Sequence, residues 1–220
     1  MIRQTKFFLW AKFSFVTVAS MALLSSVSTG YLSAAEQLDP MDSWTAQEYA
    51  QYLVEKFADV KGQQVKVDAN ADKAIGLAAG REGIILVPAE DLKEGEEHAD
   101  VHTEKGAGLA CLFMSPRFNP VIDGKQISQD KLQSVKYTDD SGNEKLATCL
   151  LLAVRNVDGD DWRLYAYGKD AKPVLDAKFQ VADEDSEGPI AMVAKEANDK
   201  SATLVLTLFG KYAANFKIGE

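Results

Sequence analysis

Apolar residues recur at two different spacings along this chain, and the first spacing is helical. Between residues 45 and 61 they recur every three or four positions, which aligns them along one face of an amphipathic helix. The aligned residues are Ala46, Tyr49, Leu53, Phe57 and Val60. Thr45 followed by Glu48 is typical of a capping box, and Gly62 is typical of a helix end. The pattern therefore predicts one helix over about residues 45–61.

Beyond residue 63 the spacing changes to two, or to short unbroken apolar runs, as in β-strands. Turn signals such as Asp123-Gly124 and Asp158-Gly159 separate the runs. About ten short strands in this arrangement predict a mainly β (α+β) fold, an antiparallel β-sandwich or barrel with one N-terminal amphipathic helix. The alternative is a helix packed on a single curved antiparallel sheet.

The first 35 residues have the layout of a secretory signal peptide. Arg3, Lys6 and Lys12 precede an apolar stretch, and small residues follow it up to Ala35. We expect cleavage after Ala35, which leaves residues 36–220 as a single exported β-rich domain, periplasmic or extracellular. An uncleaved membrane anchor is the alternative. Polar residues interrupt the leader's apolar stretch, which falls short of the roughly 18 apolar residues of a membrane span. No second apolar run long enough to span a bilayer follows it, so we expect no stable membrane insertion of residues 36–220.

The charge balance narrows the classes of partner. The chain has 24 basic and 33 acidic residues, a formal net charge of −9, and loss of the three basic leader residues takes it to −12. An acidic protein without a basic cluster is expected to bind nucleic acid or an anionic membrane poorly, because both are bound mainly through Lys and Arg side chains near their phosphates. With 46% hydrophobic residues, the chain is long enough to bury one sizeable core.

Two cysteines, Cys111 and Cys149, stand 38 positions apart in apolar, strand-like runs. Export implies an oxidising compartment, where such a pair commonly forms a disulfide. Closing that loop would stabilise the fold by about 3–4 kcal/mol. The alternative is a pair of buried free thiols that pack as small apolar groups. Their apolar neighbours argue against a catalytic cysteine, which needs a polar environment that stabilises the thiolate.

Both histidines of the chain, His98 and His102, lie in one acidic, glycine-flanked segment. If the segment is helical, they share a face, and with Glu97 or Asp100 they form a candidate site for a divalent transition metal. The zinc-protease motif H-E-x-x-H is absent, because Ala99 stands where its glutamate belongs. A solvated loop is the alternative, and we predict no cofactor beyond this possible metal.

Aromatic residues give the second candidate site. Trp162, Tyr165 and Tyr167 lie in one predicted strand, in which the two tyrosines share a face opposite Leu164 and Ala166. If the leucine face is core, the tyrosines form an exposed stripe that could bind a glycan or a peptide. If both faces are buried, the tyrosines belong to the core.

The sequence carries no complete catalytic motif that we can find. It contains no G-x-S-x-G nucleophile elbow and no glycine-rich phosphate loop. The leading hypothesis is a non-enzymatic exported domain that binds a protein, a glycan or a small ligand, or that has a structural role in the cell envelope. The rival hypothesis is a metal-binding protein or metal-dependent hydrolase that uses the segment of His98 and His102.

Overall fold

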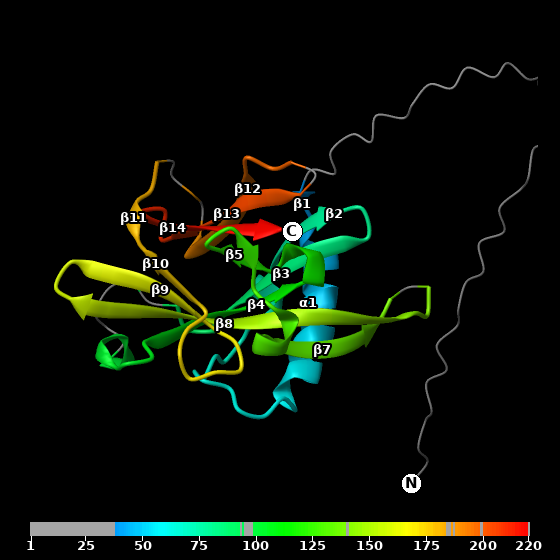
Figure 1. Ribbon diagram of the computed structural model, residues 1–220, viewed down its shortest axis with the longest axis horizontal. Helices are drawn as coiled ribbons and strands as arrows, with labels where there is room; N and C mark the ends of the chain where they lie inside the picture. The colour runs from blue at the N-terminus through cyan, green and yellow to red at the C-terminus, as the bar shows by residue number, and fades with distance from the viewer. Residues whose placement is uncertain are drawn as a thin grey trace, which may run out of the picture. The chain divides into compact units, whose positions relative to one another are not determined.

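A computed structural model describes residues 38–92, 94, 99–139, 141–183, 186, 188–198 and 200–219 (Figure 1). Residues Ala34–Glu220 form one compact unit. The predicted signal peptide, and Glu97 and His98 of the predicted metal site, lie outside the described residues. Within the described part, no helix is both long enough and apolar enough to cross a membrane.

The one α-helix of the described residues, α1, runs from Ser43 to Ala58 and begins two residues before the predicted start. Asp42 is its N-cap, and the Asp42 carboxylate accepts a hydrogen bond from the Thr45 backbone N–H at 3.0 Å. That bond is the main reason why the pKa of Asp42 is lowered. The predicted capping box of Thr45 and Glu48 is therefore wrong. The helix begins before Thr45, and Asp42 is the N-cap that accepts the bond from the free Thr45 N–H.

Eight strands pair antiparallel in the first sheet, whose curvature is visible in Figure 1. In spatial order they are β1 (Asp39–Pro40), β2 (Ile75–Ala79), β3 (Glu82–Pro88), β4 (Ala107–Met114), β8 (Glu144–Asp158), β9 (Asp161–Tyr167) and β10 (Leu175–Lys178), with β7 (Gln133–Thr138) also paired to β8. Strand β8 is long enough to hold β7 beside its first half and β9 beside its second half.

Six shorter strands form the second sheet, again with antiparallel pairing. They are β12 (Ile190–Lys195), β13 (Ser201–Leu208), β14 (Tyr212–Gly219), β5 (Pro120–Ile122), β6 (Lys125–Gln126) and β11 (Gln180–Val181), which pairs with β14. The predicted turn at Asp123 and Gly124 joins β5 to β6, and both residues have the positive φ that such a turn needs.

The elements stack in three layers: α1, the first sheet and the second sheet. On one face of the first sheet, Leu112 and Leu152 pack with Leu204 and other apolar residues of the second sheet. On its opposite face, Phe113 packs with residues of α1, among them Phe57. The first sheet is buried on both faces, which explains why its strands are unbroken apolar runs. The predicted β-sandwich with one helix is confirmed, and the single-sheet alternative is wrong.

The chain passes from the first sheet to the second at two places that matter for binding. After β10, Phe179 donates its backbone N–H to the carbonyl of Trp162 at 2.9 Å, and the chain then enters β11. After β4, the short 3-10 helix η4 (Pro116–Phe118) carries the chain to β5. Each crossing leaves an opening beside it.

Candidate ligand-binding site

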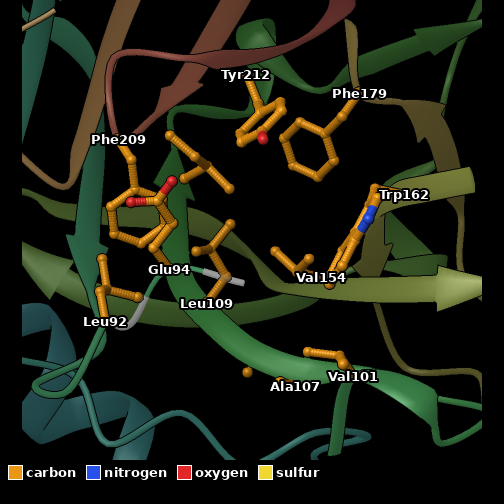
Figure 2. A pocket seen from close by; sticks show the side chains of 12 residues that line it. Leu92, Glu94, Val101, Ala107, Leu109, Val154, Trp162, Phe179, Phe209 and Tyr212 are labelled. Atoms are coloured by element: carbon orange, nitrogen blue, oxygen red, sulfur yellow. The ribbon is translucent and has the colours of Figure 1, made fainter. Parts of the chain in front are cut away.

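An apolar cavity of about 160 Å³ lies where the two sheets separate next to the first crossing (Figure 2). Most of its lining is aliphatic or aromatic. The lining residues are Leu92, Glu94, Val101, Ala107, Gly108, Leu109, Val154, Trp162, Phe179, Leu208, Phe209 and Tyr212. Both sheets and the segment before β4 therefore contribute to it.

The wall from the first sheet depends on a β-bulge in β4. Ala107 pairs with Val154 and Gly108 with Ala153, but the next pair joins Ala110 to Leu152, so Leu109 is the extra residue. A bulge leaves its extra residue outside the regular ladder and changes the direction of neighbouring side chains. Leu109 and Ala107 consequently both line the cavity.

Four aromatic rings also line the cavity, from both sheets and the segments that follow their strands. Trp162 comes from β9, Phe179 from the crossing, and Phe209 and Tyr212 from the turn between β13 and β14 (Figure 2). The turn is tight, because Phe209 has a φ of 52° and the following Gly210 a φ of 66°. This conformation brings Phe209 of the turn and Tyr212, the first residue of β14, to the same cavity.

The few polar groups of the cavity include an ion pair at its edge. The Glu94 carboxylate contacts the Lys211 ammonium at 2.6 Å, and this hydrogen bond is the main reason why the pKa of Lys211 is raised. Both side chains are about half exposed, so the pair is screened by solvent. Tyr212 is also partly exposed, at 45%.

The size and lining of the cavity suit a single ring. An engineered apolar cavity of about 150 Å³ in another protein binds benzene. Cavities that enclose a drug-sized molecule are larger, roughly 300–1,000 Å³. Among the described residues of the lining, Glu94 and Tyr212 are the only titratable side chains, and no nucleophile stands beside a base. This arrangement can hold an apolar group and orient a polar substituent.

The structure separates the three aromatic residues that the sequence singled out. Trp162 lines the cavity, whereas Tyr165 and Tyr167 are buried on the other face of β9, at 8% and 1% exposure. The exposed-stripe hypothesis is therefore wrong, and the core interpretation is confirmed. The Tyr165 hydroxyl accepts a hydrogen bond from Arg155, and the Tyr167 hydroxyl donates one to the carbonyl of Lys105.

The predicted metal site is only half described. Asp100 and His102 are exposed and belong to η3 (Ala99–His102), a 3-10 helix of four residues. Glu97 and His98 lie outside the described residues. Among the residues that are described, no three His, Cys, Asp or Glu side chains gather closely enough to hold a metal ion. The four-residue site stays a prediction from the sequence.

The structure contains Cys111 and Cys149 as free, buried thiols, so the expected disulfide is not supported. They lie on the same face of adjacent strands but not directly opposite each other. Cys111 pairs with Leu151 and Cys149 with Phe113, so the two cysteines are diagonal neighbours. Burial is the main reason why the pKa of Cys149 is raised well above its usual value. Both behave as small apolar groups beneath α1.

Most residues of the cavity had no signal in the sequence. Phe179, Phe209 and Tyr212 are far from Trp162 in the chain, and only the fold brings them together. The aromatic residues on both sides of the Gly210 turn were the one local hint. Comparison with protein-family models, with curated proteins and with solved structures finds no match for this chain.

Tyr167 gives a testable pH dependence. Burial raises its pKa to about 12, from 10 in an unfolded chain. The folded state thus holds this proton more tightly, and the resulting stability is fully present below pH 10 and lost as the pH rises through about 12. We expect the free energy of unfolding to fall between these pH values by roughly 2 kcal/mol more than in Tyr167→Phe. Urea unfolding of both proteins across this range checks it, and parallel pH profiles would contradict it.

Proposed function

We propose that this protein is a binding protein for a small molecule that carries one aromatic or alicyclic ring. The ring occupies the cavity between the sheets, and a polar substituent lies at the edge, near Tyr212 and the pair of Glu94 and Lys211. The observation that carries the proposal is the ring-sized apolar cavity with aromatic walls. Such a lining favours an apolar group over a glycan, whose hydroxyls would lose hydrogen bonds to water.

The proposed location is outside the cytoplasm. It rests on the leader-like residues 1–35, whose basic, apolar and small segments follow one another as in a signal peptide. The net negative charge of the chain makes it a poor partner for nucleic acid or an anionic membrane, and it does not bear on the proposed location.

Fluorescence of Trp162 tests the binding proposal directly. In residues 34–220 the only tryptophans are Trp44 and Trp162, so Trp44→Phe leaves Trp162 as the sole reporter. We expect titration with toluene or cyclohexanol to change its emission with a Kd of about 1 mM or lower. That affinity corresponds to about −4 kcal/mol, which is within the range for ligands of this size.

A variant that fills the cavity tests whether the probes bind there, and the same substitution elsewhere is its control. Ala107→Leu adds three carbon atoms to the cavity wall, and we expect at least tenfold weaker binding of either probe. Ala191→Leu makes the same change on β12, away from the cavity lining, and should leave binding unchanged. If neither probe alters the emission up to its solubility limit, or if both variants bind alike, the proposed function is wrong.

A further inference from the structure

The first sheet contains a slot, because β4 ends before both of its neighbours. The ladder between β4 and β8 reaches only Met114 and Thr148. The residues of β8 beyond that pair, Glu144 to Ala147, join β7 along one edge, and no strand of the described chain pairs with their other edge. On the far side of the slot, β3 extends past Met114 through Gly83 and Glu82.

The width of the slot fits one additional strand. Strands β3 and β8 are both direct neighbours of β4, and adjacent strands lie about 4.8 Å apart. Where β4 lies between them, β3 and β8 are therefore roughly 9.6 Å apart, which is the spacing across a single intervening strand. The β2–β3 and β7–β8 hairpins project toward the same side of the molecule (Figure 1).

Ser115 closes the inner end of the slot. Its backbone N–H donates to the Gly83 carbonyl at 3.0 Å, and its hydroxyl accepts from the Gly83 N–H at 3.1 Å. Pro116 follows, and because proline has no N–H to extend the ladder, the chain turns away into η4. The slot is thus closed at its inner end. Farther out, Glu82 of β3 and the adjoining turn residue Arg81 lie on one side, and Glu144–Leu146 of β8 lie on the other.

Two adjoining cavities flank the slot, one of about 460 Å³ and one of about 670 Å³. The residues that line both are Gly80, Arg81, Glu82, Ser115, Tyr137 and Lys145. The smaller cavity faces α1, where Ile85, Phe113 and Ala147 give it an apolar lining and Tyr49 and Tyr137 add aromatic rings. A side chain of an inserted strand would therefore have space on either face of the sheet.

Two cations flank the outer part of the slot on the α1 face. Side chains alternate along β8, so Lys145 shares the face of Ala147. Arg81 lies in the β2–β3 turn and lines the same cavity as Lys145. Continuing the register beyond Ser115, the second inserted residue would stand between Arg81 and Lys145. Among the described residues, the Asp139 carboxylate contacts the Lys145 ammonium at 4.0 Å and is partly exposed. A carboxylate on that second inserted residue would have Arg81 on one side and Lys145 on the other. The chain as a whole has a net negative charge.

We propose that this slot binds an extended, acidic peptide segment of another protein, which completes the first sheet by β-strand addition. Backbone hydrogen bonds to the edge of β8 provide affinity, and alternate side chains provide specificity. The residue between Arg81 and Lys145 is Glu or Asp. This site is separate from the cavity that binds the ring, and it does not depend on the proposed function.

A positional-scanning library of acetylated, amidated hexapeptides tests this proposal on residues 34–220. We expect selection of Glu or Asp at one position. When the selected peptide binds, we expect slower hydrogen exchange within Glu144–Leu146, at the amides that face the slot, because alternate residues direct their N–H groups to opposite edges of a strand. In Arg81→Glu, we expect at least tenfold weaker binding of that peptide, and recovery when its acidic residue is replaced by Lys. Lys172→Glu makes the same charge change at an exposed position outside the slot and should have no effect.

The result separates the alternatives. Arg81 is exposed at the tip of a hairpin, so its variant should unfold at the same temperature as the parent protein. Lys145→Glu is the second variant and should reproduce the change of preference. The proposal is overturned if no acidic position is selected, if the preference survives both variants, or if exchange slows elsewhere and not at Glu144–Leu146. Self-association that both variants abolish would instead assign the slot to a second copy of this chain, which also overturns it.

Discussion

Gly108→Ala should destabilise the protein by at least about 3 kcal/mol, which is at or beyond the usual cost of an over-packed core. A Cβ at this position would lie 2.0 Å from the carbonyl oxygen of Lys66. Non-bonded heavy atoms rest about 3.5–4.0 Å apart, and a backbone carbonyl cannot rotate away as a flexible side chain can. Either β4 or the segment that contains Lys66 must move. Urea unfolding, or loss of folded protein on expression, measures the effect.

Gly142→Ala is the matched control for that substitution. Gly142 lies in the β7–β8 turn with a φ of 80°, and no atom lies within 4 Å of the position of an added Cβ. The control should cost only about 1 kcal/mol, from the left-handed backbone alone. Equal losses in both variants would contradict the close approach of β4 to Lys66. Because Gly108 also lines the ring cavity, this approach fixes one wall of the proposed binding site.

The sequence predicted those features that depend on neighbouring residues. Alternation and turn glycines are local signals, so the β-rich class and the Asp158-Gly159 hairpin follow from them. The start of α1 was placed too late because Thr45 and Asp42 both suit an N-cap, and only the three-dimensional position of the Asp42 carboxylate decides between them.

Features that depend on tertiary packing were not predictable in this way. Unbroken apolar runs indicate burial on both faces of a strand, but they do not say whether a helix or a second sheet covers each face. Tyr165 and Trp162 lie on opposite faces of β9. Only the arrangement of the layers decides that Tyr165 packs in the core on the α1 face and that Trp162 lines a cavity. The bulge at Leu109 likewise leaves no distinctive residue pattern, so the cavity could not be anticipated.

Phe113→Ala should cost about 3–5 kcal/mol and lower the melting temperature by roughly 10 °C. Phe113 is 1% exposed and lies on β4 between Ile85 and Cys149, beneath α1. Its ring meets that of Phe57 edge-on, at 5.7 Å between centroids and an angle of 86°. Truncation leaves a void that the paired strands cannot close, because their backbones are held by hydrogen bonds on both sides. Thermal and urea unfolding measure the loss.

A double-mutant cycle with Phe57→Ala tests whether α1 packs on this face of the first sheet. The two rings touch, and each single substitution already removes that contact. We therefore expect the double variant to lose about 0.5–1.5 kcal/mol less than the sum of the two separate losses. Tyr52→Ala is the control on α1, because Tyr52 is 39% exposed and should change stability by less than about 0.5 kcal/mol. Strict additivity of Phe57 and Phe113 would place α1 elsewhere. It would also remove the wall that Tyr49 of α1 supplies to the peptide slot, so the cycle tests the support of that site as well as the fold.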